Sequence, residues 1–442
     1  MSSSRLTTLT FTHQCQIALD GFFLGRHTWR AVRRLLFREV TSWVHDQNQE
    51  EKNMRMLRLS MCSLVLGAVI AGCEESETET IPENRFGKIY AAKYFNPPGT
   101  LDSVEAQFQE MESLGVTHIF LLEPFFERAH IKQALRHTSL KTWMISQIFF
   151  NDHNHLSDTE DNPLLAIRAD GSVAIGESPG NWLEMACPNN GPGYDPANPS
   201  EGYRETTIAR IVESVGTHRP YGLSLDFVRY FAFWERILEG TDPGDLHDTC
   251  FCSRCLSLFS QAHGVAIPTE LTETRDVAAW IHANALEAWI AFKTNTITSF
   301  VTEVAAAVKA VDPEIKINVH GVPWRRADFN DAAKRIAGQD FGALAQVVDV
   351  ISPMCYAKML EREPAWINSV VEDIAAQIDM TSTMIIPAFQ VVGDMYVEGP
   401  VTIEEFRAYM NESLKGSSAG VAFWPWEQMT DEQKEVIRQT LM

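Results

Sequence analysis

Eight short apolar runs alternate with eight helical stretches between Lys88 and Met442 of this 442-residue chain. Runs that are apolar almost throughout are typical of parallel strands that are covered on both faces. Strand–helix alternation repeated eight times predicts an α/β fold, a closed parallel (β/α)8 TIM barrel. In such a barrel the functional side chains follow the carboxyl ends of the strands. The runs are 88–94, 117–123, 141–150, 221–228, 314–320, 348–356, 383–389 and 420–426.

Capping residues indicate where the first and last helices begin. Thr100 and Asp102 precede a helical pattern that stops at Gly115, and Thr402 and Thr430 precede the last two helices. Two long segments lack periodicity: 151–200 after the third strand and 231–268 after the fourth. Loops of this length in a compact domain are usually functional, so we expect the first to lie over the barrel mouth.

Charge and composition exclude some classes of partner. Hydrophobic residues make up 45% of the chain, which is enough for a sizeable core. The net charge of -21 argues against nucleic acid or an anionic membrane surface as the main partner.

Residues 54–73 have the features of a bacterial export signal. Arg55 and Arg58 precede an apolar run, 61–71, that is too short to span a bilayer. The run ends in Ile-Ala-Gly-Cys, which resembles the lipobox of bacterial lipoproteins. The resemblance implies that Cys73 is lipidated and that the protein is held in the bacterial cell envelope, periplasmic or at the cell surface, through lipid only. A plain signal peptide or a single anchor helix are the alternatives.

The signal has 53 residues ahead of it, although export signals belong at the start of a chain. The simplest interpretation is a start codon assigned too early, with translation beginning at Met54 or Met56. A genuine N-terminal extension is the alternative. Residues 74–84 read as an acidic tether, and 85–442 as the (β/α)8 barrel domain.

Four cysteines outside the leader suggest a metal site. Cys250, Cys252 and Cys255 form a C-x-C-x-x-C run, and Cys187 can supply a fourth thiolate from another loop. The pattern resembles the structural zinc site of certain β-galactosidases, and it implies a structural zinc ion that joins the two loops. Disulfides, which an exported protein can form, and free thiols are the alternatives.

The fourth run ends in LSLDFVRY, which places an acid at a strand end. With a period of two, Ser224 and Asp226 share one face of the strand. A carboxylate there is costly to bury without a partner, and Arg229 is a nearby cation. We expect Asp226 to be catalytic or substrate-binding; a structural pair with Arg229 is the alternative.

The phrases LDFVRY and SPMCY resemble signatures of uncharacterised glycoside-hydrolase-like barrels, over roughly Lys88 to the C-terminus. This resemblance implies a carbohydrate-active barrel, with Asp226 as the leading catalytic candidate. It does not imply a particular sugar.

Glycosidic cleavage usually needs a second carboxyl group. Glu123, at the end of the second run, is the best candidate by position, followed by Asp152, Glu427 and Asp394. The fifth and seventh runs end in His320 and Gln390, where common barrel glycosidases place a glutamate.

Aromatic residues at strand ends could stack on sugar rings. Tyr356 and Trp424 are the strongest of six candidates, of which about half are expected to be core. The others are Trp182, Trp234, Trp324 and Trp426. The predicted substrate-binding set is Lys93, Asp152, Arg229, His320, Trp324, Tyr356, Gln390 and Trp424.

These features favour a glycoside hydrolase that cleaves a poly- or oligosaccharide with no organic cofactor. His153 and His155 lack the neighbouring carboxylate pattern of a catalytic metal site. A non-catalytic carbohydrate-binding lipoprotein that kept the barrel is the alternative, and a barrel deacetylase or lyase is a third hypothesis. Fold alone does not decide among them.

Overall fold

The structure is a computed structural model that describes residues 88–151, 165–174, 184–189, 203–393 and 401–442. The chain divides into two compact units, Met1–Glu79 and Thr80–Met442, and every described residue belongs to the second. The predicted signal, the tether and Cys73 therefore lie outside the described residues. Among the described helices, none combines the length and the apolarity that crossing a membrane requires.

A parallel sheet forms the centre of the described unit, in the order β10-β11-β1-β2-β3-β6-β7-β8-β9. Each of the eight predicted runs contains a strand of this sheet, so the predicted strand–helix alternation is confirmed. The strands are β1 (Ile89–Tyr94), β2 (His118–Leu122), β3 (Lys141–Gln147), β6 (Gly222–Asp226), β7 (Lys316–Gly321), β8 (Val350–Pro353), β9 (Met384–Ile385), β10 (Ala388–Gln390) and β11 (Gly420–Trp424).

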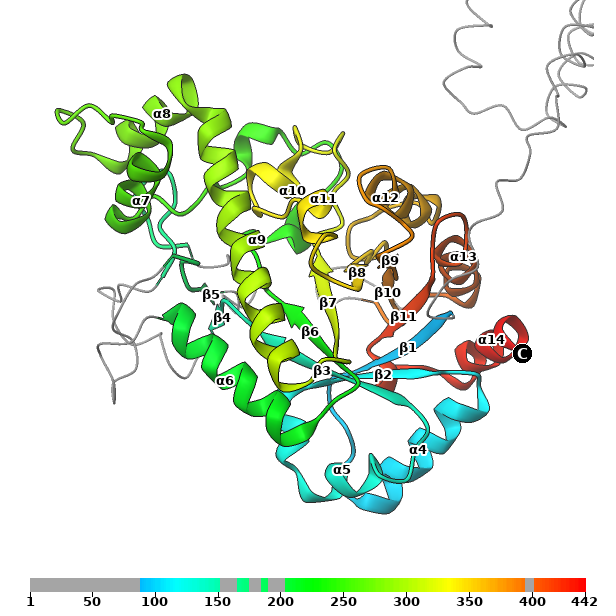
Figure 1. Ribbon diagram of the computed structural model, residues 1–442. Helices are drawn as coiled ribbons and strands as arrows, with labels where there is room; N and C mark the ends of the chain where they lie inside the picture. Colours follow the sequence, from blue (N-terminus) through cyan, green and yellow to red (C-terminus); the bar gives the residue numbers. More distant parts are fainter. Residues whose placement is uncertain (1–87, 152–164, 175–183, 190–202, 394–400) are drawn as a thin grey trace, which may run out of the picture. The chain divides into compact units, whose positions relative to one another are not determined.

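The sheet closes on itself through one strand that is built in two pieces. β9 pairs with β8 and β10 pairs with β11, and only Ile386 and Pro387 separate them. Single bridges, Met354 with Ala388 and Ile385 with Ser418, link each piece to the neighbour of the other. The two pieces thus act as the seventh strand, and the TIM-barrel fold predicted from the sequence is confirmed (Figure 1).

Helices connect successive strands and cover the outside of the barrel, with the long α9 beside α6 (Figure 1). They are α4 (Leu101–Ser113), α5 (Ala129–Ala134), α6 (Tyr203–His218), α9 (Leu286–Val311), α10 (Ala332–Arg335), α11 (Phe341–Leu344), α12 (Ala365–Ala375), α13 (Ile403–Ser413) and α14 (Asp431–Leu441). Thr100, Thr402 and Thr430 cap α4, α13 and α14 as predicted, the last two through complete capping boxes.

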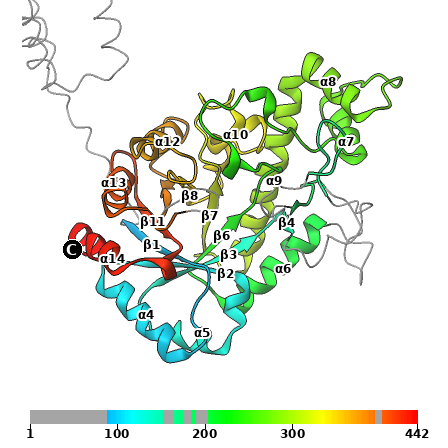
Figure 2. The same ribbon diagram turned by 180° about the vertical axis from the view of Figure 1, so that it is seen from behind.

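Most of the first predicted insertion, 151–200, lies outside the described residues, and so does the test of its expected place over the barrel mouth; the second, 231–268, is present. Between β3 and α6 the chain forms a small antiparallel pair, β4 (Phe150–Asn151) and β5 (Glu184–Met185). Between β6 and α9 lie two short 3-10 turns, η2 (Trp234–Arg236) and η3 (Pro243–Asp245), and two helices. These helices, α7 (Ser253–His263) and α8 (Thr274–Asn284), project beside the upper end of α9 (Figure 2).

Large side chains fill the amino half of the barrel interior. The rings of Phe120 and Trp143 stack with centroids 5.3 Å apart, and Phe120 lies 6.0 Å from His320. Since β2 and β7 are not neighbours in the sheet, the second contact crosses the barrel. A Cβ on Gly222 would lie 2.3 Å from the Trp143 ring, so only glycine fits at this point.

Candidate active site

Asp226 ends β6 with its side chain on the inner face of the barrel, where only 8% of the residue is exposed. Its Oδ1 accepts a hydrogen bond from the N–H of Phe227 at 2.9 Å. Phe227 has a φ of 52°, a left-handed conformation that is unfavourable for an aromatic residue. The carbonyl of Asp226 accepts from the N–H of Ile148, which ties this strand end to the end of β3. Strain of this kind is often concentrated at functional sites.

Two other buried side chains share the interior with Asp226. Lys93 of β1 is only 2% exposed; burial lowers the pKa of its ammonium group, and the nearby Asp226 carboxylate opposes this effect. Burial also lowers the pKa of His320 to about 3, and Lys93 adds to that shift while Asp226 opposes it. Strands β1, β6 and β7 therefore direct an amine, a carboxyl group and an imidazole toward one another.

A chain of hydrogen bonds leads to His320. Ser352 Oγ donates to Asn318 Oδ1 at 2.8 Å, and Asn318 Nδ2 donates to Ser224 Oγ at 2.8 Å. Ser224 Oγ in turn lies 3.0 Å from His320 Nε2, within hydrogen-bond distance. The other ring nitrogen, Nδ1, is buried and has no hydrogen-bond partner within the described part of the chain.

Arg229 is a fully buried cation three residues after Asp226. Its Nη1 donates to the carbonyl of Ala232 at 2.7 Å and approaches Met185 Sδ at 3.4 Å, while its Nε and Nη2 have no hydrogen-bond partner among the residues that the structure describes. Burial lowers the pKa of the guanidinium, and Glu235 and Asp226 oppose this by attraction. A buried guanidinium with free donors next to two carboxylates can hold an anionic group or a developing negative charge.

Glu235, in η2, is the acidic residue that the sequence interpretation missed. It is buried, and its carboxylate acts on the same two groups as that of Asp226, Arg229 and the hydroxyl of Tyr356. Burial raises the pKa of Tyr356 most, and Asp226 and Glu235 raise it further. Glu235 stands among aromatic residues in an irregular loop, and no periodic pattern in the sequence distinguishes it.

Glu123 is not at the barrel mouth, contrary to its predicted pairing with Asp226. It follows β2 on the outer face, where its carboxylate accepts hydrogen bonds from Arg210 and Ser214 of α6 and from Ser146 of β3. The Ser214 and Ser146 bonds measure 2.5 and 2.8 Å. With its oxygens engaged by the helix layer, Glu123 holds α6 against the barrel and is not available as the second carboxyl of the site.

Two predicted aromatic residues meet at the carboxyl ends of β8 and β11. The rings of Tyr356 and Trp424 stack with centroids 4.8 Å apart. Trp234 contacts Tyr356 at 5.6 Å from within the buried core, and Trp426 is core as well. Gln390 is buried beside them, and its Oε1 accepts from the N–H of Met359 at 3.1 Å.

The remaining predicted residues are dispersed. Trp324 is buried and lines a separate cavity of about 210 Å³ with Phe231 and Phe233. Glu427, after β11, accepts from the N–H of Phe95 at 3.2 Å, and burial raises its pKa. Asp152, His153, His155, Trp182 and Asp394 lie outside the described residues.

The four predicted cysteines converge on one point. The Sγ atoms of Cys187, Cys250, Cys252 and Cys255 all lie within 4.8 Å of one another, and Cys187 is 3.2 Å from Cys255 and 3.8 Å from Cys252. Four thiolates at tetrahedral zinc are roughly 3.7 Å apart, given Zn–S bonds of about 2.3 Å. Hydrogen bonds from the other three thiols lower the pKa of Cys252, which favours a thiolate. The cluster can hold a metal ion.

Asn189 links this cluster to the candidate active site. Its Nδ2 lies 3.5 Å from Cys255 Sγ and 3.1 Å from the hydroxyl of Tyr230, the residue after Arg229. Backbone N–H groups also approach the sulfurs, that of Ile167 at 3.3 Å from Cys250 Sγ. Such donors around the sulfurs are typical of metal-binding thiolates.

A buried ion pair supports the same loop. Lys293 of α9 donates to Asp248, whose other oxygen accepts from Trp289 and His282 at 2.9 Å each. Although burial raises the pKa of Asp248, attraction to Lys293 and His282 lowers it overall. The carboxylate is fully bonded within the protein, which makes it a structural group.

The fold resembles the catalytic domains of several glycoside hydrolases. A β-amylase catalytic domain from Paenibacillus polymyxa aligns over 80% of this chain and 98% of its own, with 11% identity and a TM-score of 0.52. The glycoside hydrolase domain of PgaB (BpsB) from Bordetella bronchiseptica aligns over 80% and 99%, with 12% identity and a TM-score of 0.53.

A β-galactosidase from the psychrophilic Marinomonas ef1 aligns over 80% of this chain at 10% identity, with a TM-score of 0.54, and the match spans 59% of that enzyme. The sequence matches no protein-family model and no curated protein. At these identities the likeness shows a shared barrel fold.

Proposed function

We propose that this protein is a glycoside hydrolase whose acid pair is Asp226 and Glu235. One observation supports this most directly: both carboxylates act on Arg229 and Tyr356, so two acids, a cation and a phenol gather beyond the end of β6. Glycosidic cleavage needs one acid that is protonated and one that is ionised, in different surroundings. The glycosidase-like fold and the Tyr356–Trp424 stack agree with a carbohydrate substrate.

In the mechanism that we infer, Asp226 acts as the nucleophile or base, with Lys93 and Arg229 close to it. Glu235, enclosed among aromatic residues, is the group that protonates the departing oxygen. His320 stays neutral, because burial lowers its pKa to about 3. Trp424 supplies a flat apolar surface for a sugar ring.

The experiment is a screen of the domain from about Glu83 onward against a panel of polysaccharides. Wild type should release reducing ends from at least one member, and Asp226→Asn and Glu235→Gln should each lower turnover by about a hundredfold or more. Asp379→Asn is the matched control, because Asp379 is an exposed turn carboxylate that bonds Thr381. Near-normal turnover in Asp226→Asn would remove Asp226 from the catalytic role.

A non-catalytic carbohydrate-binding protein is the second candidate. It is favoured by Gln390 and His320, which stand where common barrel glycosidases carry a glutamate and are held by Met359 and Ser224. Binding of a glycan by the wild type without any turnover, unchanged in Glu235→Gln, would support this function.

We propose that the four cysteines hold a structural zinc ion, which suits an all-thiolate tetrahedral set. Purified protein should contain about one zinc per chain. Absence of metal together with absence of titratable thiols would assign the cluster to disulfides instead.

We also propose that Cys73 is lipidated and anchors the protein in the bacterial cell envelope. The lipobox-like Ile70 to Cys73 supports this. Full-length protein expressed in a bacterium should partition into detergent, and Cys73→Ala should abolish its acylation as measured by mass spectrometry.

A further inference from the structure

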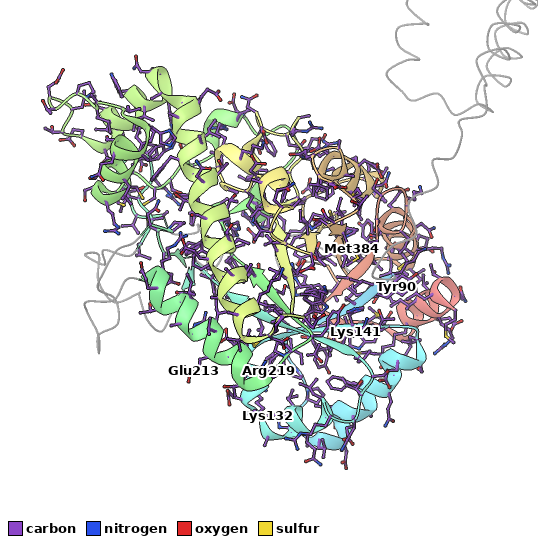
Figure 3. All side chains as sticks on the ribbon, viewed as in Figure 1. Tyr90, Lys132, Lys141, Glu213, Arg219 and Met384 are labelled. Atoms are coloured by element: carbon purple, nitrogen blue, oxygen red, sulfur yellow. The ribbon has the colours of Figure 1, made fainter. Side chains whose placement is uncertain are left out.

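A second large cavity lies at the opposite end of the barrel, where the strands begin. Its volume is about 520 Å³, and it is enclosed by the end of α5, the start of β3 and the turn between α6 and β6. Figure 3 labels three residues of its lining, Lys132, Lys141 and Arg219. No residue of the candidate active site lines it, so the two sites are separate.

The lining of this cavity is strongly basic. It includes five basic side chains and no aspartate or glutamate, in a chain whose net charge is -21. The five are Lys132, Arg136, Lys141, His218 and Arg219. A concave site lined by charges of one sign concentrates ligands of the opposite sign.

Within the residues that the structure describes, two of these cations have no anionic partner. Glu127 accepts from Lys132 at 3.0 Å and from His218 at 2.8 Å, so one nearby carboxylate already serves that pair. Within the described part of the chain, the side chains of Arg136 and Lys141 make no ion pair or hydrogen bond. Lys141 Nζ instead lies 4.9 Å from the centre of the Tyr221 ring.

Arg219 adds a conformational argument. Its φ of 48° lies in the left-handed region, which non-glycine residues rarely adopt. Its Nη1 donates to the carbonyl of Val311 at 2.8 Å and is 3.8 Å from Asp312, which holds the guanidinium in place at the rim of the cavity. A strained residue at the edge of a pocket motivates a functional hypothesis.

We propose that this cavity binds a small ligand that carries an oxyanion, a phosphate or a carboxylate, with Arg136 and Lys141 as the main cations. A guanidinium fork can bond two anion oxygens at once, and an ammonium adds a compact charge. Phe126, Leu140 and Pro220 form apolar walls for the uncharged part of the ligand. The volume falls in the range of small-molecule sites rather than flat macromolecular surfaces.

The test is calorimetric titration of the domain from about Glu83 onward with four probes. The probes are inorganic phosphate, glucose 6-phosphate, glucuronate and neutral glucose. We expect glucose 6-phosphate or glucuronate to bind at least tenfold more tightly than glucose, and more weakly as salt is added. The phosphate and sugar-acid arms distinguish which anion is preferred. The double variant Arg136→Gln/Lys141→Gln should weaken binding at least tenfold.

Arg275→Gln/Lys415→Gln is the matched control, because it removes the same charge from exposed positions outside the cavity. Equal affinity of wild type and Arg136→Gln/Lys141→Gln for the charged probes, or no preference for them over glucose, would overturn the proposal. Glycan turnover, which depends on Asp226 and Glu235, is measured separately, so a negative result for one site does not affect the test of the other.

Discussion

The rings of Tyr356 and Trp424 stack with centroids 4.8 Å apart and planes 11° from parallel, which joins the ends of β8 and β11. Trp424 is the more exposed of the two, and Tyr356 is almost fully buried. In the proposed function, the exposed part of Trp424 is the surface that a sugar ring meets.

Replacing Trp424 should weaken substrate binding more than it weakens the fold. Trp424→Ala is expected to raise the KM for the glycan about tenfold, since loss of an aromatic stacking surface costs on the order of 1–1.5 kcal/mol. Trp424→Phe should recover most of the loss. Steady-state kinetics and a melting curve check this, and Trp366→Phe, a buried residue of α12, is the control for general repacking.

Glu123→Gln should destabilise the fold and spare activity. The variant weakens charge-assisted bonds to Arg210 and Ser214, and we expect about 1 kcal/mol less free energy of unfolding, because Arg210 is half exposed and its attraction is screened. Turnover should stay within about threefold of wild type. Urea unfolding and kinetics check both; a hundredfold loss of turnover with normal stability would return Glu123 to the list of catalytic candidates.

The metal cluster should be coupled to Arg229 through Asn189. Asn189→Ala keeps all four sulfurs, so zinc content should remain about one per chain, while backbone amides of residues 226–237 should exchange with deuterium at least tenfold faster. Cys252→Ser should lose the metal, and the backbone amides of residues 226–237 should exchange faster in this variant too. Cys355→Ser, at a buried cysteine outside the cluster, should change neither; unchanged exchange in Asn189→Ala would contradict the coupling.

Two buried histidines should make the fold sensitive to acid. Burial lowers the pKa of His118 and of His320 to about 3, with Lys141 and Lys93 contributing. Below about pH 6.5 the unfolded chain binds protons at these two positions and the folded chain does not, so the free energy of unfolding falls as pH falls toward about 3. Above pH 6.5 both histidines are neutral in the folded and in the unfolded state, so they contribute no further change to the free energy of unfolding.

Each histidine should contribute up to about 1.4 kcal/mol per pH unit inside that window. His320→Gln should remove the contribution of one histidine to the slope of the free energy of unfolding against pH between pH 6.5 and 5. His137→Gln, at an exposed site, should leave this slope unchanged. Urea titrations at several pH values measure it. An identical slope in His320→Gln would show that His320 is protonated in the folded state.

The barrel was predictable because its signals are local. Apolar runs and capping threonines depend on neighbouring residues only, and the observed strands lie within one or two residues of most predicted runs. The cysteines were equally accessible, because their spacing alone determines that they can share one ion.

The proposed second acid, Glu235, was not predictable from the same kind of signal. Strands that are buried on both faces show no alternation of apolar and polar residues, so the sequence does not show whether Glu123 faces the inside or the outside of the barrel. Arg210 and Ser214, which turn it outward, are about ninety residues away in the chain. Glu235 reaches the site from an irregular loop, where only the three-dimensional path of the backbone brings it near Arg229.

The two-piece seventh strand affects where the barrel can open. Pro387 has no N–H to give, and β9 and β10 together supply only five strand residues. This join has the fewest paired residues of the central sheet, two between β8 and β9 and three between β10 and β11, and its opening would expose the edges of β8 and β11 together. Unpaired strand edges can pair with other chains. We therefore expect a variant that weakens this stretch to aggregate before its helices unfold.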